Sequence, residues 1–158
     1  MLSRRNFAKV ITVVTLAGTL RANADEQIVR VSKDPNCDCC GGWVAHLHDA
    51  GFTVAVTNTN DLGAVKAQLG VPSDLAACHT AEVAGYTIEG HVPASVIRRL
   101  LRERPLAKGL AVAGMPVGSP GMEVPGTAPE EYDVILFGAE RRTYARMRGS
   151  TEFALPKS

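Results

Sequence analysis

The sequence predicts an α/β fold in which a β-α-β-α unit is followed by a β-hairpin and a further helix. Short segments in which apolar and polar residues alternate, as is typical of strands, are interspersed along the chain with segments that have apolar residues at helical spacing. Glycine and proline separate these segments, and neither an internal repeat nor a linker divides the chain. We therefore expect a single domain with one hydrophobic core.

The first half of the predicted domain carries the β-α-β-α unit. Ile28 to Val31 and Phe52 to Val56 have the composition and alternation of strands. Gly41 to Ala50, between them, has helical spacing and is followed by a glycine, which often ends a helix. Asp61 to Leu69 is a second, short helix. A helix that connects two neighbouring strands favours parallel pairing of those strands.

A β-hairpin and the most regular helix follow. Ala76 to Thr80 and Ala84 to Ile88 are predicted strands, joined around Glu82 and Val83. Pro93 to Arg104 is predicted to be helical, because proline suits the first position of a helix and apolar residues then recur on one face.

The last part of the chain begins with a long loop. Lys108 to Pro129 is rich in glycine and proline and holds Met115 and Met122. A loop of this length in a small domain is usually functional or disordered. Tyr132 to Phe137 is a predicted last strand, and we interpret the basic segment Arg141 to Arg148 as a solvated tail.

Residues 1–24 resemble a Tat export signal. A twin-arginine pattern at positions 3–9 precedes the apolar segment Val10 to Leu20, and Ala22 to Ala24 has the small residues of a cleavage site. A membrane anchor is the alternative, but these 11 residues are fewer than the about 20 that span a bilayer. We therefore expect the mature domain, residues 25–158, to lie in a bacterial periplasm, free of the membrane.

The charge balance gives no reason to expect nucleic acid as a partner. Without residues 1–24, the chain keeps 13 lysines and arginines against 16 aspartates and glutamates. The resulting formal charge of about −3 provides no basic surface for a phosphate backbone.

Three cysteines, Cys37, Cys39 and Cys40, lie where the first strand meets the first helix. They can be paired as Cys-x-x-Cys, as Cys-x-Cys or as a vicinal pair, and thiolates this close either exchange disulfides or hold a soft metal ion. Because a helix N-terminus stabilises a thiolate, Cys37 should be the most reactive thiol, with Cys40, one turn on, as its disulfide partner. Cysteines at this point of a β-α-β unit, followed by a hairpin and a helix, are typical of a thioredoxin-like fold.

Further soft ligands lie elsewhere in the chain, at Cys78, His91, Met115 and Met122. Thiolate, thioether and imidazole groups together favour Cu(I). Zinc sites also use cysteine and histidine, but they usually space their cysteines more widely and leave methionine out. The alternatives are that Cys78 is an inert buried thiol, that His91 is simply a polar loop residue, and that the two methionines fill gaps in the core.

The other three histidines are expected outside this site. His79 should point to the opposite face of its strand from Cys78, so that both cannot easily enter one site. His46 and His48 are two residues apart on a predicted helix and point in different directions. We interpret them as surface or hydrogen-bonded core residues.

Three segments carry a resemblance to a known family: Lys33 to Trp43 with the cysteine cluster, Ser73 to Ala94 with Cys78 and His91, and Gly114 to Glu123 with both methionines. Over nearly all of the expected mature chain, the sequence resembles a periplasmic metal-binding family, formerly of unknown function, that includes the copper-resistance protein CopG. The resemblance implies a thioredoxin-like fold, copper binding at the Cys-x-Cys-Cys segment and a role in periplasmic copper handling.

Two functions of different classes remain open. The first is a copper-binding protein that sequesters or transfers Cu(I), with a periplasmic copper donor or acceptor protein as its partner. The second is a thiol-disulfide or copper oxidoreductase that uses Cys37 and Cys40. A purely structural pair of disulfides is disfavoured, because a bridge that closes so short a loop stabilises little. The crowding of three sulfurs and the nearby methionines favour the first function.

Overall fold

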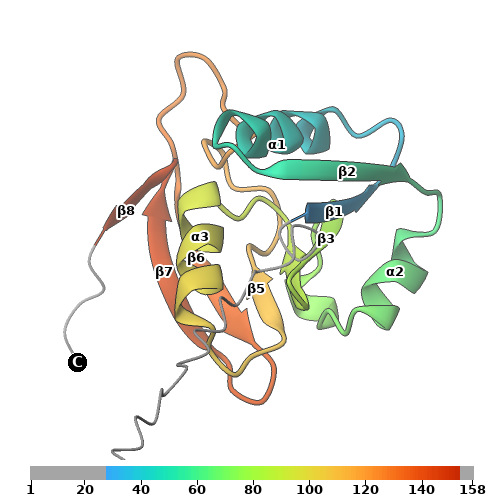
Figure 1. Cartoon of the computed structure of the whole chain (residues 1–158). Helices are drawn as coiled ribbons and strands as arrows, with labels where there is room; N and C mark the ends of the chain where they lie inside the picture. The colour runs from blue at the N-terminus through green and yellow to red at the C-terminus, as the bar shows by residue number, and fades with distance from the viewer. Residues whose placement is uncertain (1–27, 154–158) are drawn as a thin grey trace, which may run out of the picture.

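Within residues 28–153, which the computed structural model describes, eight strands form one sheet in the order β2-β1-β3-β4-β5-β6-β7-β8 (Figure 1). The strands are β1 (Ile28–Lys33), β2 (Thr53–Asn58), β3 (His79–Val83), β4 (Tyr86–Glu89), β5 (Gly109–Ala111), β6 (Glu131–Phe137), β7 (Arg142–Arg148) and β8 (Thr151–Phe153). The helices are α1 (Asp38–Asp49), α2 (Leu62–Gln68), α3 (Ala94–Glu103) and the short 3₁₀ helix η2 (Ser73–Leu75). The fold is therefore a mixed α/β fold.

The predicted β-α-β-α unit, hairpin and following helix occur in the expected order. β1 pairs with β2 in parallel, as the intervening helix requires, and with β3 in antiparallel orientation. α1 begins at Asp38, three residues earlier than predicted. Cys39 and Cys40 therefore lie in its first turn, and Cys37 is the N-cap residue.

The hairpin turn lies two residues later than predicted. β3 and β4 pair through Val83 and Tyr86, and the loop between them is Ala84 and Gly85, not Glu82 and Val83. Both loop residues have positive φ, 49° and 82°, which is the conformation of a tight two-residue hairpin turn. β3 consequently begins at His79.

The interpretation of Arg141 to Arg148 as a solvated tail is wrong, because all of this segment except its first residue forms β7. Ala145 and Met147 are buried in the core. The arginines on the other face pair with acidic residues of β6, Arg146 with Asp133 and Arg148 with Glu131. Cross-strand ion pairs of this kind allow a basic segment to form an inner strand.

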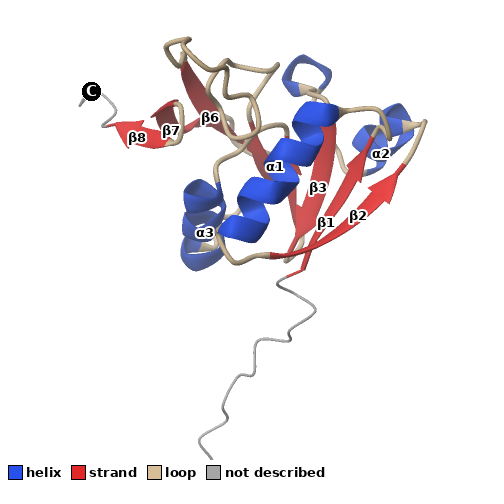
Figure 2. Ribbon diagram, turned by 90° about the horizontal axis from the view of Figure 1, so that it is seen from above, coloured by secondary structure: helices blue, strands red, loops and turns tan. Residues whose placement is uncertain are grey.

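The helices cover both faces of the sheet. α1 and α3 lie on one face, whereas α2 lies on the other (Figure 2). Val31 pairs with Ala81, so these side chains share the α1 face, while Thr80 points toward α2. The largest hydrophobic cluster lies between the sheet and the helices α1 and α3. Its buried members include Val29, Val31, Trp43, Leu47, Ile88, Ile97, Leu100 and Val134.

None of the helices in residues 28–153 is long and apolar enough to cross a membrane. The predicted export signal, residues 1–24, lies outside the described residues.

Candidate metal and redox site

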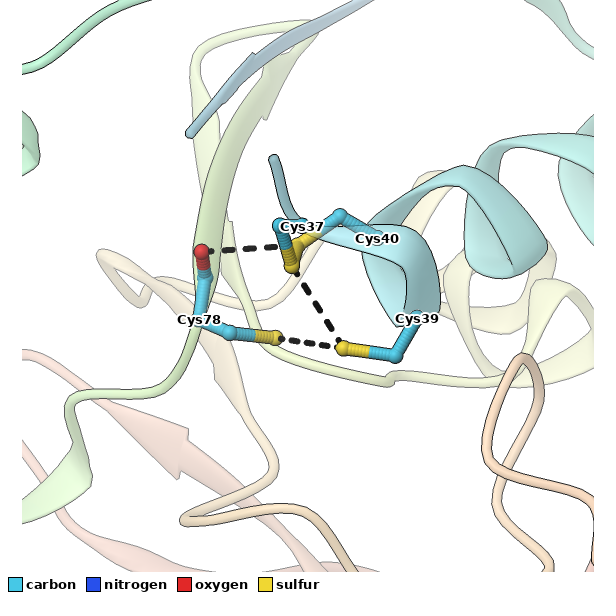
Figure 3. A group of neighbouring side chains, drawn as sticks. All are labelled: Cys37, Cys39, Cys40 and Cys78. Atoms are coloured by element: carbon cyan, nitrogen blue, oxygen red, sulfur yellow. Dashed lines mark hydrogen bonds between the residues drawn. A yellow bond between two sulfur atoms is a disulfide. The ribbon is translucent and has the colours of Figure 1, made fainter. Parts of the chain in front are cut away.

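The start of α1 brings two of the clustered cysteines into covalent contact. Cys37 and Cys40 form a disulfide, with their Cα atoms 5.4 Å apart (Figure 3). The predicted pairing of these two cysteines is confirmed. One helical turn separates them, so the helix itself sets this spacing.

Cys39 and Cys78, which are free and half-buried, lie directly beside this disulfide (Figure 3). Sγ of Cys39 lies 3.4 Å from Sγ of Cys37 and 3.7 Å from Sγ of Cys78. Sγ of Cys40 lies 3.5 Å from the carbonyl oxygen of Cys78. All four sulfurs lie within 4.8 Å of one another, although Cys78 is 38 residues away from Cys40 in the chain.

His91 approaches the same cluster from the segment between β4 and α3. Its Nε2 atom lies 3.2 Å from Sγ of Cys78, and its Nδ1 atom lies 2.8 Å from the carbonyl oxygen of Pro120. Because that oxygen can only accept, Nδ1 carries the proton and Nε2 is left as an acceptor. This arrangement, with one ring nitrogen tied to a backbone carbonyl and the other free, is common in metal-binding histidines.

His79 also belongs to the cluster, contrary to the prediction that it points away from Cys78. Its Nδ1 atom lies 3.4 Å from Sγ of Cys78, and its ring centroid lies 4.9 Å from that of His91. The alternation rule fails here because Cys78 lies in a bend before β3, so only His79 belongs to the strand. The sequence signal for His79 is its position directly after Cys78.

One polar atom of His79 has no partner in the described part of the protein. Nε2 is fully buried and makes no hydrogen bond. Such unsatisfied buried groups are rare, and a polar atom left free beside sulfur and imidazole groups fits a site for an additional ligand. Cys78, His79 and His91 thus form a second set of possible ligands, which shares Cys78 with the four-sulfur set.

Burial at this site favours the uncharged forms of the Cys78 thiol and of the two imidazoles. Burial, reinforced by the nearby Cys39, raises the pKa of the Cys78 thiol to about 12. Burial and the neighbouring His91 lower the pKa of His79 to about 3, and burial lowers the pKa of His91. Both imidazoles are therefore in the neutral form that binds metals, whereas a metal ion would have to displace the Cys78 proton. The lowered pKa expected for Cys37 applies to its reduced form and stays a prediction.

The long loop after β5 lies against the first turn of α1. A Cβ atom added to Gly121 would lie 2.5 Å from the backbone nitrogen of Trp43 and 2.7 Å from the carbonyl oxygen of Cys39. The backbone of this loop therefore lies directly beside the cysteine cluster. Met122, the next residue, is half-buried, and Met115 is 53% exposed. Ligation by either sulfur stays a prediction.

His46 and His48 lie outside the cluster, as predicted. Nε2 of His46 accepts a hydrogen bond from the backbone N–H of Ala94 at 3.1 Å, and His48 is exposed. His46 thereby connects α1 to the first residue of α3.

Comparisons with known proteins identify one family and two similar solved structures. The family described as "Protein of unknown function, DUF411" matches residues 75–122, the segment that contains Cys78, both site histidines and the loop to Met122. No curated protein matches the chain. Two solved structures, "Copper resistance protein copG- Form 1" and "Form 2", are each 42% identical to the chain, with a TM-score of 0.72.

These similarities extend over almost the whole length of the related protein. The first structure is matched over 77% of this chain and 98% of its own, and the second over 76% and 97%. With this identity and coverage, the chain belongs to the family of the copper resistance protein CopG.

Proposed function

We propose that the protein is a periplasmic copper-binding protein, exported by the Tat route, that sequesters or transfers Cu(I) in copper resistance. The observation that carries the proposal is the convergence of four sulfurs, from Cys37, Cys39, Cys40 and Cys78, within 4.8 Å. Thiolates in such a group favour Cu(I) over the hard cations that prefer oxygen. The relatives named as copper resistance proteins support the same metal.

In this proposal, Cys37, Cys39 and Cys40 are the principal ligands, and Cys78 is a fourth. His91 and His79 add neutral imidazole nitrogens. Two thioethers, those of Met115 and Met122, complete the set from the loop, whose backbone at Gly121 lies against Cys39. Copper is the cargo, and a periplasmic donor or acceptor protein is the expected partner.

The fold supports this assignment through the position of α1. The strand order β2-β1-β3-β4, with β3 antiparallel to its neighbours and α3 after the hairpin, is the arrangement that we propose as thioredoxin-like. In it, the first turn of α1 faces the bend before β3, so that Cys39 and Cys78 meet.

Because of the disulfide, the number of thiols available at the proposed site depends on the redox state of the protein. Cys37 and Cys40 cannot act as thiolate ligands while they are bonded to each other. Reduction of this bond takes two electrons and two protons and returns two thiols, for example at the expense of a dithiol that becomes a disulfide. Only the reduced protein would then offer all four sulfurs.

A thiol-disulfide oxidoreductase that uses Cys37 and Cys40 is the second candidate function. It is favoured by one observation, the free thiol of Cys39 at 3.4 Å from Sγ of Cys37. Once deprotonated, the Cys39 thiol can attack Sγ of Cys37, so that a bond between Cys37 and Cys39 forms and Cys40 leaves as the thiolate.

Replacement of Cys37, Cys39 and Cys40 by serine tests the principal function. The reduced variant should fail to take Cu(I) from a chromogenic chelator that the reduced wild-type protein depletes. Unchanged copper stoichiometry in a folded triple variant would contradict the proposal. If the copper-free wild-type protein catalyses the reduction of a disulfide substrate by an added dithiol, and Cys37→Ser does not, the result would favour the oxidoreductase.

A further inference from the structure

We propose that Glu89, together with Lys66, is a positioning residue for the Cys78 thiol of the copper site. The inference rests on the proposed copper function, but its geometry can be tested without copper. Glu89 is the last residue of β4, two residues before His91, and its side chain is fully buried. A buried carboxylate is unfavourable unless it is paired and hydrogen-bonded, so its partners indicate what it does.

The carboxylate of Glu89 holds the chain on both sides of Cys78. Oε1 accepts a hydrogen bond from the backbone N–H of Ala77 at 2.6 Å, directly before Cys78. Oε2 accepts a hydrogen bond from the hydroxyl of Thr80 at 2.6 Å, two residues after Cys78. The bend that carries the thiol is therefore fixed at both ends by one side chain.

Lys66 completes this network from α2. Its Nζ atom donates to Oε1 of Glu89 at 2.5 Å and to the hydroxyl oxygen of Thr80 at 2.9 Å. Lys66 thus neutralises the buried carboxylate and joins α2 directly to Thr80, which follows Cys78, and through Glu89 to Ala77, which precedes it. The network leaves Cys78 with its sulfur 3.2 Å from His91 and 3.7 Å from Cys39.

The packing of Gly90 brings the backbone beside Glu89 into contact with the bend that carries Cys78. A Cβ atom added to Gly90 would lie 2.8 Å from Cβ of Ala77 and 2.5 Å from the carbonyl oxygen of Val112. The backbone between Glu89 and His91 therefore lies directly against Ala77. If the hydrogen bond from the backbone N–H of Ala77 to the Glu89 carboxylate is lost, the Cys78 thiol should move relative to both Cys39 and His91.

The test must remove the positioning contact without leaving a buried unpaired charge. Replacing only Glu89 by leucine would strand Lys66, whereas the double variant K66M/E89L replaces a buried ion pair by apolar side chains, which often preserves stability. The conservative variant E89Q keeps an acceptor for Ala77. The matched control, D133L/R146M, removes the ion pair between Asp133 and Arg146, which joins β6 to β7.

Cu(I) affinity is measured in the reduced proteins by chelator competition. We expect K66M/E89L to lose about 10- to 100-fold in affinity, the usual effect of removing a group that orients a metal ligand. E89Q should keep most of the affinity, and D133L/R146M should keep all of it. Wild-type affinity in folded K66M/E89L would overturn the inference.

A second measurement uses no copper. In the oxidised protein, Cys39 and Cys78 are the free thiols of the chain's four cysteines, and the short bifunctional reagent dibromobimane can bridge them. Mass analysis should find fewer bridges in K66M/E89L than in the wild type or the control. If the wild type binds no Cu(I), the proposed function fails, while reduced bridging still supports positioning by Glu89. Equal bridging in all variants overturns it.

Discussion

The ring of His91 ties the glycine-rich loop to the cysteine cluster by donating a 2.8 Å hydrogen bond from Nδ1 to the carbonyl oxygen of Pro120. The same ring reaches Sγ of Cys78 with its other nitrogen. Movement of the loop and movement of the thiol are therefore linked through one side chain. Changes in the loop should alter the site even where they touch no sulfur.

The first prediction concerns Gly121, which follows Pro120. Gly121→Ala should destabilise the protein by more than about 1–3 kcal/mol, because the added Cβ meets the backbone of α1 at a position with φ of +85°. Gly126→Ala is the matched control, since Gly126 has φ of +77° but no atom within 4 Å of the added Cβ. Urea unfolding measures both. Equal destabilisation would mean that the close contact with α1 contributes nothing beyond backbone strain.

The second prediction is that copper and the disulfide compete for the same sulfurs. In the oxidised copper-free protein, an alkylating reagent should label Cys39 and Cys78 and spare the bonded pair. After reduction all four should react, and Cu(I) should then protect Cys37, Cys39 and Cys40. Peptide mass spectrometry locates the labels. Equal labelling of Cys37 and Cys40 in reduced protein with and without copper would exclude this competition.

The third prediction separates the two loop methionines from core packing. Replacing Met115 and Met122 by leucine keeps apolar bulk and removes both thioethers, so Cu(I) affinity should fall while the melting temperature changes little. Met147→Leu is a suitable control, because Met147 is fully buried in the core. Reduced stability with unchanged affinity would instead identify Met115 and Met122 as packing residues.

The fourth prediction is a loss of stability in acid. Burial lowers the pKa of His79, His91 and His46, in the last case against the opposing effect of Glu123 and Asp49. The unfolded chain thus binds more protons below about pH 6.5, the ordinary histidine value. The histidine contribution to the free energy of unfolding should be complete above pH 6.5. The contribution of His79 should decrease toward pH 3, the region of its pKa, by up to about 1.4 kcal/mol per pH unit. The contributions of His91 and His46 should also decrease below pH 6.5.

Denaturant unfolding of the copper-free protein at a series of pH values measures this dependence. His46→Gln retains an acceptor for the N–H of Ala94 but no longer titrates, so it should flatten the curve below pH 6.5. His48→Gln replaces an exposed histidine of the same helix and should leave the curve unchanged. A curve that is equally steep in both variants would contradict a role for His46.

The β-α-β-α unit and the helix after the hairpin can be predicted because each has strong local periodicity and clear end signals. Their exact boundaries cannot, because the periodicity of a segment does not fix its first and last residues. α1 begins at Asp38 rather than at the predicted Gly41. At this earlier start, Cys37 and Cys40 lie close enough to form a disulfide. The turn at Ala84 is hard to predict because alanine seldom adopts positive φ, and only the following glycine marks it.

The C-terminal strands depend on partners that are distant in the sequence. Four arginines within Arg141 to Arg148 suggest exposure, yet carboxylates of β6 lie opposite two of them. The bulge between Val134 and Ile135 also disturbs the alternation, so that Tyr144 and Ala145 are both buried. Neither the ion pairs with β6 nor the bulge can be derived from the sequence of Arg141 to Arg148 alone.

Much of the candidate site can be predicted, because three cysteines within four residues serve few purposes besides disulfide exchange and the binding of soft metals. The proximity of Cys78 to Cys39 follows from the way β3 pairs with β1. The prediction for His79 is wrong because the start of a strand decides whether neighbouring side chains diverge. That start is at His79, which pairs with the distant residue Lys33. The role of Glu89 cannot be predicted, since the sequence of so short a strand does not show whether its carboxylate is buried or exposed.

The position of Trp43 has an optical consequence. It is the only tryptophan of the chain, it is fully buried, and its ring centroid lies 4.4 Å from that of His79. Its indole N–H donates to the carbonyl oxygen of Val92 at 2.8 Å, which fixes the ring against the imidazole. The intrinsic fluorescence therefore originates beside the candidate site, and its emission should report ligand arrival in real time without an attached dye.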